Sequence, residues 1–243
     1  ESADYHDPIL DSPVFSLYGE TRRPTEDMLE HFDVLLCDVQ DIGCRIYTYI
    51  TTLLYLLEAC AEYNKSIWIL DRPNPAGREV EGLLLESGWE SFVGAGAIMM
   101  RHGLSFAEMA QWFVNNYKID VDLNVIAMQA YDPHSAPGFG WPAGMTWVNP
   151  SPNASSLNMA RVYAGTVLLE GTELSEGRGT STPLEVVGAP DIDIHKILTK
   201  MASLKPTWLR GVRIRACYFE PTFHKYQNRL CQGFQLHTDF AEY

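Results

Sequence analysis

Residues 33–49 read Asp33-Val34-Leu35-Leu36-Cys37-Asp38-Val39-Gln40-Asp41-Ile42-Gly43-Cys44-Arg45-Ile46-Tyr47-Thr48-Tyr49, and this stretch decides the fold class. Its apolar run over 34–37 is typical of a strand that is covered on both faces of a parallel sheet. Polar and turn-forming residues follow, and from Ile46 to Ala61 apolar residues recur at helical spacing. The order is therefore strand, charged turn, helix. Ligands of open α/β sheets bind at the carboxyl ends of strands, so we expect a site at this turn.

A second buried strand is predicted over 66–70. It ends in the sequence Asp71-Arg72-Pro73-Asn74-Pro75-Ala76-Gly77, which continues neither a strand nor a helix. Two strands with a helix between them form a β-α-β unit, which is right-handed almost without exception. Charged residues therefore follow the ends of two neighbouring strands.

Weaker patterns place the remaining elements of the first half. Residues 1–13 look irregular, 14–18 reads as a short strand, and Thr25 is a candidate cap for a helix that reaches about Phe32. Ser105 and Glu108 form a capping box before an amphipathic helix that extends to Tyr117. Alternation over 121–128 predicts a further strand.

The composition changes over 131–156, where five prolines, three glycines and two tryptophans occur. A loop of this length is usually functional or a boundary. We expect a Rossmann-like domain over 1–130, with a parallel sheet and helices on both faces. A smaller α/β (α+β) domain over 131–243 begins with this Pro/Gly/Trp-rich loop, which lines the cleft. Its predicted helices are 156–169 and 194–204, and its predicted strands are 212–218, with one face buried, and 230–237.

The charge limits the partners of the chain. A formal charge of −13 and a pI near 4.9 argue against a nucleic-acid-binding face and against attraction to anionic membranes. No apolar segment reaches the ~20 residues of a membrane helix, so we expect no membrane insertion. No signal peptide precedes Glu1. A removed leader would fit a secreted or periplasmic location, and a cytoplasmic location is the alternative.

The sequence predicts neither a disulfide nor a metal or cofactor site. The five cysteines show no C-x-x-C pair and no zinc-type spacing, and we interpret them as mostly buried thiols. The histidines are scattered. There is no H-E-x-x-H, G-x-S-x-G, Walker A or G-x-G-x-x-G string, which argues against NAD, ATP and serine-hydrolase chemistry.

Four polar loops, 38–47, 71–90, 147–153 and 170–182, mix carboxylates, Asn or Arg with Gly and Pro. Glycoside hydrolysis requires paired carboxylates, because one protonates the leaving oxygen and the other acts as base or nucleophile. The alternative for any single carboxylate is a solvated or capping role. The candidates are Asp38, Asp41, Glu81, Glu170, Glu173 and Glu176.

Arginine, aromatic and histidine side chains complete the candidate set. The arginines could clamp an anionic group bidentately or form ion pairs that order the loops. The aromatic residues could stack on a sugar face or pack in the core, and the histidine could be an acid, a base, a donor or a satisfied structural residue. These residues are Arg45, Arg72 and Arg178, then Tyr47, Trp141 and Trp147, and His102.

At these loops the chain resembles the DUF1343 or YbbC-like family, whose members are NamZ-type exo-β-N-acetylmuramidases of peptidoglycan turnover. The matching strings run in one order along the chain. They include Tyr18-Gly19-Glu20-Thr21-Arg22-Arg23-Pro24, Asp38-Val39-Gln40-Asp41-Ile42-Gly43, Leu70-Asp71-Arg72-Pro73-Asn74-Pro75, Glu81-Gly82, Arg101-His102-Gly103, Pro150-Ser151-Pro152-Asn153, Leu169-Glu170-Gly171-Thr172 and Ser175-Glu176-Gly177-Arg178-Gly179-Thr180.

The resemblance implies an active site between two domains. It also implies release of terminal N-acetylmuramic acid from the non-reducing end of peptidoglycan fragments, and the lactyl carboxylate of that sugar would give the arginines a purpose. On this basis we predict Asp41, Glu81 and Glu176 as catalytic, with Glu176 binding sugar hydroxyls or supporting the acid. The predicted substrate-binding residues are Asp38, Arg45, Tyr47, Arg72, Asn74, His102, Asn153, Glu170 and Arg178.

The sequence departs from the family pattern in one respect. Members carry an upstream Gly-Pro-Glu-His-Gly loop and extend further, so we expect a fragment or a chain trimmed at both ends. The alternative functions are a non-catalytic saccharide-binding protein built on the same cleft, and an esterase- or amidase-like hydrolase.

Overall fold

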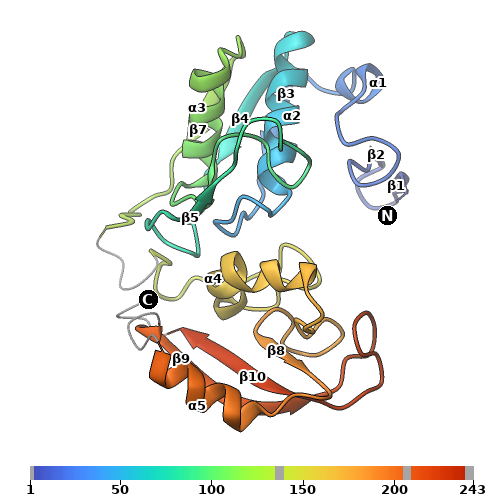
Figure 1. Ribbon diagram of the computed structural model, residues 1–243. Coiled ribbons are helices and arrows are strands. Elements are labelled where there is room, and N and C mark those ends of the chain that lie inside the picture. Colours follow the sequence, from blue (N-terminus) through green and yellow to red (C-terminus); the bar gives the residue numbers. More distant parts are fainter. Residues whose placement is uncertain (1–2, 135–139, 205–208, 239–243) are drawn as a thin grey trace.

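The computed structural model describes residues 3–134, 140–204 and 209–238. Figure 1 shows two lobes, with the elements up to β7 in the upper lobe and those from α4 onward in the lower lobe. The predicted Tyr131–Ser156 loop connects the lobes, and its residues 135–139 lie outside the described part. No described helix is long and apolar enough to cross a membrane.

A three-stranded parallel sheet forms the centre of the upper lobe. It consists of β3 (Val34–Cys37), β4 (Ser66–Leu70) and β7 (Leu123–Ile126), in the order β3-β4-β7. Helix α2 (Tyr49–Glu62) connects β3 to β4, and α3 (Phe106–Tyr117) precedes β7. The strand-turn-helix order and the helix behind the capping box are therefore confirmed, although α2 begins three residues later than its apolar pattern.

Both helices pack on one face of this sheet. Ile67 and Ile69 of β4 are fully buried and share a core with Leu53 of α2 and Phe113 of α3. Leu35 and Cys37 of β3, and Leu123 and Val125 of β7, point to the same face. Alternation along each strand puts every second side chain into this core.

The opposite face of the sheet is exposed in the described structure. Leu36 is 59% exposed, Trp68 38% and Ile126 46%. The prediction that β3 is covered on both faces is therefore wrong for the described residues. An apolar run shows that a strand can be buried on both faces. Whether a second face is covered depends on elements elsewhere in the chain, which the strand's own sequence does not specify.

The N-terminal segment differs from its prediction. Residues 5–7 (β1, Tyr5–Asp7) and 12–14 (β2, Ser12–Val14) pair as an antiparallel hairpin, and the strand expected over 14–18 is absent there. The Asp7 carboxylate accepts the backbone N–H groups of Ile9 and Leu10, so a local side-chain turn closes this hairpin. Helix α1 (Glu26–Leu29) ends before Phe32, and the Thr25 side chain makes no cap hydrogen bond.

A second hairpin lies beside the charged turn. Strands β5 (Glu81–Leu84) and β6 (Met99–Arg101) pair antiparallel, in a region where the sequence showed no clear period. The turn after β3 pairs with the edge of β6. The Arg45 N–H donates to the Met100 carbonyl, and Cys44 and Arg101 form an isolated antiparallel β-bridge. The charged turn is thereby fixed to a hairpin some 55 residues further along the chain.

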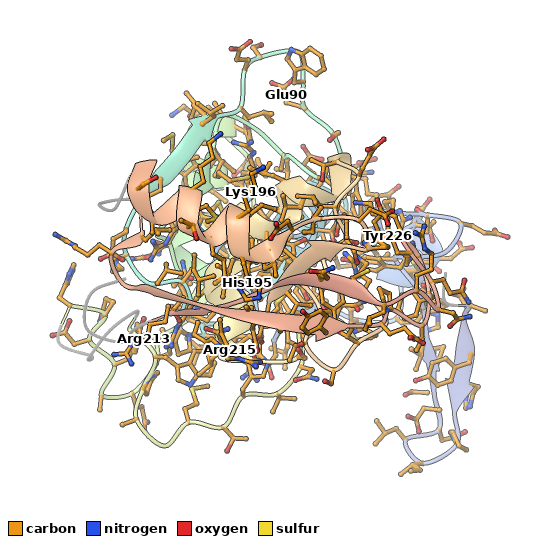
Figure 2. The ribbon with its side chains drawn as sticks, turned by 60° about the horizontal axis from the view of Figure 1, so that its bottom comes forward. Glu90, His195, Lys196, Arg213, Arg215 and Tyr226 are labelled. Atoms are coloured by element: carbon orange, nitrogen blue, oxygen red, sulfur yellow. The ribbon has the colours of Figure 1, made fainter. Side chains whose placement is uncertain are left out.

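The lower lobe is an antiparallel sheet with helices. Helix α4 (Leu157–Thr166) is capped by Ser156, as predicted, and continues as a 3-10 turn, η1 (Val167–Gly171). Strands β8 (Val186–Ala189), β10 (Cys231–Thr238) and β9 (Val212–Phe219) follow the order β8-β10-β9. Helix α5 (Ile194–Leu204) packs against β10, and Figure 2 labels His195 and Lys196 in its first turn.

Two details of the lower lobe were not predicted. Strand β8 was missed, although all four of its residues are buried. In β9 the expected one-face burial holds only partly, because Tyr218 is exposed while Phe219 is half-buried. Strand β9 is an edge strand, so its burial depends on neighbours at one side only. All five cysteines are free thiols, and four of them are buried, as predicted.

The two faces of the parallel sheet should respond differently to truncation. Ile69→Ala on the covered face removes a fully buried side chain and should cost about 2–5 kcal/mol of the free energy of unfolding. Leu36→Ala on the exposed face should cost no more than about 0.5 kcal/mol. Urea unfolding of both variants is the measurement, and equal losses would show that both faces are covered.

Candidate active site

An ion pair joins the carboxyl ends of the first two parallel strands. Asp38 follows β3 directly, Arg72 follows β4 by two residues, and Arg72 Nε donates to Asp38 Oδ1 at 2.6 Å. Both side chains are about half exposed. Asp38 engages only Nε, so the two terminal nitrogens of Arg72 have no hydrogen-bond partner among the described residues. They are available for a bidentate contact with an anion.

This pair lines a hollow of about 270 Å³, which we call the charged compartment. Its other walls include Gln40, Tyr49, buried Trp141 and, from the loop that connects the lobes, Asn149 and Pro150. The connecting loop is ordered here by its own indoles: Trp141 Nε1 donates to the Met145 carbonyl, and Trp147 Nε1 donates to the Ala154 carbonyl. Residues of this connecting loop therefore line part of the hollow.

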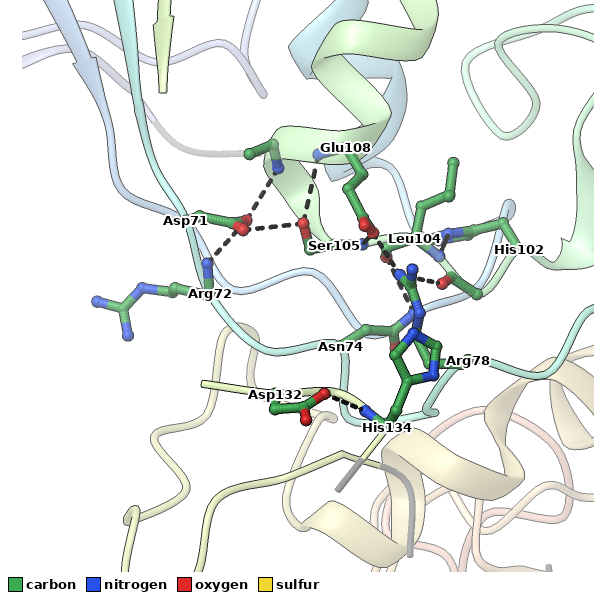
Figure 3. A network of polar contacts seen from close by, with 12 residues as sticks. Asp71, Arg72, Asn74, Arg78, His102, Leu104, Ser105, Glu108, Asp132 and His134 are labelled. Carbon is green, nitrogen blue, oxygen red and sulfur yellow. Dashed lines mark hydrogen bonds and ion pairs between the residues drawn. The ribbon is translucent and has the colours of Figure 1, made fainter. Parts of the chain in front are cut away.

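The neighbouring Asp71 has a different role. Its Oδ1 accepts the backbone N–H of Ala107 at 2.9 Å, and its Oδ2 accepts the Ser105 hydroxyl at 2.9 Å (Figure 3). Both partners lie at the N-terminus of α3, where the helix dipole favours a negative charge. Asp71 therefore fixes α3 to the end of β4.

The turn after β3 is held against the turn after β4 by a close contact. The Asn74 amide donates to the Leu104 carbonyl and accepts the Ala76 N–H, so its orientation is fixed. Gly43, at φ +79°, lies against it: a Cβ on Gly43 would be 2.2 Å from Asn74 Oδ1. Asn74 was predicted to bind substrate, and in the structure it is a buried residue that shapes the turn.

Asp41 and His102 form a buried pair in the same region. The Leu104 N–H donates to His102 Nδ1, so the imidazole carries its proton on Nε2 and donates it to Asp41 Oδ2 at 3.2 Å. The Gly43 N–H donates to the same oxygen at 2.7 Å. The other oxygen, Oδ1, is buried without a hydrogen-bond partner in the described structure.

A second hollow, of about 370 Å³, adjoins the first and is lined by tyrosines; we call it the tyrosine compartment. Its walls include Tyr18, Tyr47, Tyr49, Tyr163, Pro150 and Ser151. The two compartments share Tyr49 and Pro150, and the Tyr49 hydroxyl donates to the Pro150 carbonyl at 2.6 Å. The site is therefore a two-part cleft with this contact as its partition.

Tyr47 is the most constrained of these tyrosines. Its ring packs against Tyr49 at 4.9 Å and edge-on against Tyr163 at 6.0 Å. Its hydroxyl is buried, with the Ser151 and Tyr49 side chains beside it. Burial raises the pKa of Tyr47 far above its ordinary value, so the hydroxyl stays protonated and can donate.

Two of the predicted residues, Arg45 and Glu81, line a third hollow of about 410 Å³ between the β5-β6 hairpin and α4. Arg45 Nη1 donates to the Leu83 and Ile98 carbonyls, and burial lowers the pKa of Arg45. Glu81 is mostly exposed and accepts from Arg101 Nη1 at 2.6 Å. Arg45 thus ties the charged turn to the hairpin, and Glu81 is the most accessible of the predicted catalytic carboxylates.

The predicted residues of the 170–182 loop form an ion network in the lower lobe. Glu176 is buried and contacts Lys225 Nζ at 3.0 Å and Arg178 Nε at 3.6 Å. Arg178 also pairs with Glu170. Lys225 Nζ donates in addition to the Leu169 and Leu174 carbonyls, so this network closes the loop. The three predicted side chains therefore all have partners within the protein.

A shared hydrophobic cluster joins the charged turn to α4 of the lower lobe. Ile42 and Cys44 of the turn pack with Met159 and Tyr163 of α4 and with Leu184. Tyr163 lies within electrostatic reach of Asp41 as well as of Glu170 and Arg178, and burial raises its pKa. Asn153 is half-buried in the turn after Pro152, next to the wall of the tyrosine compartment. Residues of the loops 38–47, 71–90 and 147–153 therefore line neighbouring hollows, and Tyr163 links them to the ion network of the 170–182 loop.

Comparison with known proteins identifies the family. Residues 1–158 match the family model "Exo-beta-N-acetylmuramidase NamZ, N-terminal", and residues 161–243 match "Exo-beta-N-acetylmuramidase NamZ, C-terminal". The chain belongs to the NamZ family.

Relatives with known names and structures agree with this assignment. The chain is 41% identical over 244 aligned residues to the peptidoglycan β-N-acetylmuramidase NamZ of Bacillus subtilis; the alignment covers 98% of the chain and 56% of that relative. The chain thus spans little more than half of the relative's length. Two crystal structures of DUF1343 family proteins from Bacteroides fragilis are also similar. The first has a TM-score of 0.82 and 33% sequence identity, and the match covers 97% of this chain and 61% of that structure. The second has a TM-score of 0.74 and 30% sequence identity, and the match covers 95% of this chain and 59% of that structure.

Some residues of this NamZ-family site were missed by sequence reasoning. Tyr18, Tyr49 and Tyr163 line the tyrosine compartment but were not among the candidates. The Tyr47-Thr48-Tyr49 string was a usable signal for Tyr49, because it stands where the charged turn enters α2. Tyr18 opens the family string of residues 18–24, which was a usable signal, whereas no local pattern distinguishes Tyr163 from a core tyrosine.

No group of three or more His, Cys, Asp or Glu side chains suited to a metal ion occurs within residues 3–134, 140–204 and 209–238. The acidic and basic side chains of the site are instead arranged in pairs.

Gly43→Ala should destabilise the protein by about 1–3 kcal/mol more than Gly144→Ala. Both glycines have left-handed φ values, +79° and +83°, so both variants carry backbone strain. Only Gly43 faces a fixed side chain, because a Cβ on Gly144 would meet no atom within 4 Å. Chemical unfolding of the two variants measures the difference, and equal losses would show that the Asn74 contact is unimportant.

Glu108, at the start of α3, should make stability depend on pH. Burial opposes its ionisation, but the hydrogen bonds from Arg78 and from the Ser105 N–H outweigh burial and lower the pKa of Glu108 below its ordinary 4.5. The lowered pKa stabilises the fold above pH 4.5, and this stabilisation is lost as pH falls through the folded-state pKa.

Glu108→Gln should therefore lower the unfolding free energy at pH 7, and the difference from the natural chain should shrink below about pH 4.5. Denaturant unfolding at a series of pH values is the measurement, with exposed Glu86→Gln as the control. A constant difference down to pH 3 would contradict this role of the Glu108 charge.

Proposed function

We propose that this protein is an exo-β-N-acetylmuramidase that releases terminal N-acetylmuramic acid from peptidoglycan fragments. The observation that carries the proposal is membership of the NamZ family, including 41% identity to a named peptidoglycan β-N-acetylmuramidase. The site supports it in chemical terms, because the cleft combines the Asp38 carboxylate, an arginine with free donors, and tilted or edge-on aromatic rings.

Arg72 is our candidate for recognising the lactyl carboxylate of the sugar. Its guanidinium lies at the carboxyl end of β4 in the charged compartment, and Asp38 orients it through Nε alone. A planar guanidinium with both terminal nitrogens available matches a carboxylate bidentately. The protein would thus bind an acidic sugar through the Arg72 guanidinium, although its own net charge is negative.

Asp41, Glu81 and Glu176 remain the proposed catalytic carboxylates. Asp41 has one buried oxygen without a partner, and Glu81 is accessible beside a hollow. Glu176 is enclosed by Lys225 and Arg178, which suits the supporting role better than direct proton transfer. Arg45, Asn74, His102, Glu170 and Arg178 are proposed to hold the loops of the cleft in place. Tyr47 forms part of the cleft wall, and Asn153 lies next to it.

The finer features of the fold are part of the same proposal. The helix-connected parallel strands support a Rossmann-like sheet, with the domain boundary near residue 130. Cell-wall fragments as substrate favour a secreted or periplasmic protein. We expect no nucleic-acid partner, on the grounds of charge.

The alternative is a saccharide-binding protein without catalysis. One observation favours it: Asp38, Glu81 and Glu176 are each paired with a cation, so none of the three is a free carboxylate. Titration calorimetry of the full-length protein with a peptidoglycan disaccharide separates the two functions. Binding heat without product release would support the binding protein.

The test of the enzyme is turnover of a chromogenic β-N-acetylmuramide by the full-length protein. We expect release of the chromophore, and much slower release from the matching β-N-acetylglucosaminide, which lacks the lactyl carboxylate. Turnover of only the glucosaminide, or of neither compound, would contradict the proposal.

Arg72→Met should raise KM for the muramide by about 10-fold to 100-fold, because charge-assisted hydrogen bonds to the carboxylate are lost. KM for the glucosaminide should change little. Arg229→Met is the matched control, since Arg229 is an exposed arginine paired with Asp191 in the lower lobe. If Arg72→Met affects both substrates equally, Arg72 does not recognise the carboxylate.

A further inference from the structure

The guanidinium of Arg22 packs on two aromatic rings. It lies 5.4 Å from the centre of the Tyr18 ring and 4.8 Å from the centre of the Phe92 ring. These rings meet edge to face at 5.9 Å, and Phe92 stacks on Tyr55 at 6.2 Å. The Tyr18 ring is fixed further by a hydrogen bond of 2.8 Å between its hydroxyl and that of Thr48. Because the negative faces of aromatic rings attract a cation, the rings orient Arg22.

The turn that carries Arg22 is also held in place. The Thr21 hydroxyl donates to the Arg23 carbonyl at 2.6 Å, and the Arg23 N–H donates to the same hydroxyl at 3.2 Å. The side chain of Arg23 pairs with Glu62 of α2. Two consecutive arginines therefore have different surroundings, a carboxylate for Arg23 and aromatic rings for Arg22.

The N–H groups of Arg22 are available to a ligand. Within residues 3–134, 140–204 and 209–238, its exposed guanidinium has no hydrogen-bond or ion-pair partner. By contrast, Arg23, Arg78 and Arg229 each pair with a carboxylate of this acidic chain. Stacking on rings uses the flat face of a guanidinium and leaves the N–H groups at its edge free. Arg22 can therefore offer two parallel N–H groups to an anion.

The position of Arg22 relates it to the cleft. Tyr18, on which Arg22 packs, lines the tyrosine compartment. Arg72 lines the charged compartment only, on the other side of the partition formed by Tyr49 and Pro150. The cleft thus has one oriented cation in its charged compartment and a second beside the wall of its tyrosine compartment. Two separate cations suit a ligand that carries two separate anionic groups.

We propose that Arg22 binds a second carboxylate of the substrate, on the part of the peptidoglycan fragment that remains after the terminal sugar is released. The inference rests on the proposed function, in which Arg72 recognises the carboxylate of the terminal sugar. It adds Arg22 as a specificity-determining residue for longer fragments. Two groups of a longer fragment have the required chemistry: the lactyl carboxylate of the next muramic acid along the glycan, and the carboxylates of a peptide attached to that sugar.

The experiment compares three fragments as substrates of the full-length protein. The first is the disaccharide of N-acetylmuramic acid β-linked to N-acetylglucosamine, which has one carboxylate. The second is a trisaccharide that adds another N-acetylmuramic acid with a free lactyl carboxylate. The third is the same trisaccharide with a peptide on the added sugar, so that its second anionic group belongs to the peptide.

We expect a longer fragment to have a KM about threefold to tenfold below that of the disaccharide, the effect of a partly exposed, charged hydrogen bond. A lower KM for the second fragment identifies the lactyl carboxylate as the group that Arg22 binds. A lower KM for the third fragment alone identifies the peptide carboxylates.

Three variants test whether Arg22 causes this difference. Arg22→Met should bring the KM of the longer fragment up to that of the disaccharide, because methionine still packs on the rings but has no N–H donors. Phe92→Leu should reduce the difference in part, since the guanidinium loses one of the rings that orient it. Arg23→Met is the matched control: it removes the neighbouring arginine and its pair with Glu62, and should keep the difference.

The outcomes separate this inference from the proposed function. If the protein hydrolyses no fragment, but calorimetry shows tighter binding of a longer fragment that Arg22→Met abolishes, the muramidase fails and carboxylate recognition by Arg22 stands. If all three fragments are hydrolysed with equal KM, the muramidase stands and the role of Arg22 is overturned. A difference that survives in Arg22→Met would also overturn it, as would a variant that only unfolds at a lower temperature.

Discussion

The close contact between the Gly43 backbone and the Asn74 amide is the constraint on which the site depends. Asn74 is fixed by the Leu104 carbonyl and the Ala76 N–H, and only a residue without a Cβ can approach it at this φ. The contact folds the turn after β3 onto the turn after β4. From there Arg45 donates to a carbonyl of the β5-β6 hairpin. Tyr47 precedes α2, and Tyr49, its first residue, donates to the Pro150 carbonyl of the connecting loop.

The same constraint explains why most polar side chains of the loops have partners inside the protein. A tightly folded turn removes backbone N–H and C=O groups from water. Each such group that lacks a hydrogen-bond partner lowers the stability of the fold by about 1–3 kcal/mol. Asp71, Arg45 and Asn74 provide these partners to α3, to the hairpin and to the second turn. The groups that remain unpaired among the described residues are therefore informative: they include the terminal nitrogens of Arg72 and Asp41 Oδ1.

Packing between the lobes completes the cleft. Ile42 from the upper lobe, Tyr163 from α4 and Leu184 from the lower lobe belong to one buried cluster. Tyr163 of this cluster lines the tyrosine compartment and lies within electrostatic reach of Glu170 and Arg178, although about 130 residues separate the 170–182 loop from the charged turn in sequence. The cleft is thus a product of apolar burial, and the charged groups are positioned by side chains that carry no charge.

The sequence by itself determined the elements whose signals are local. The strand-turn-helix of residues 34–62, the capping box of Ser105 and Glu108, the Ser156 cap and the family strings all depend on residues within a few positions of one another. Only the tertiary structure decided which face of the sheet is covered, that 81–84 and 99–101 pair, and that Asn74 shapes a turn. It also decided that Tyr18, Tyr49 and Tyr163 share a hollow. The physical reason is that burial and hydrogen-bond partners are set by atoms distant in the chain, whereas periodicity and capping are set by neighbours along it.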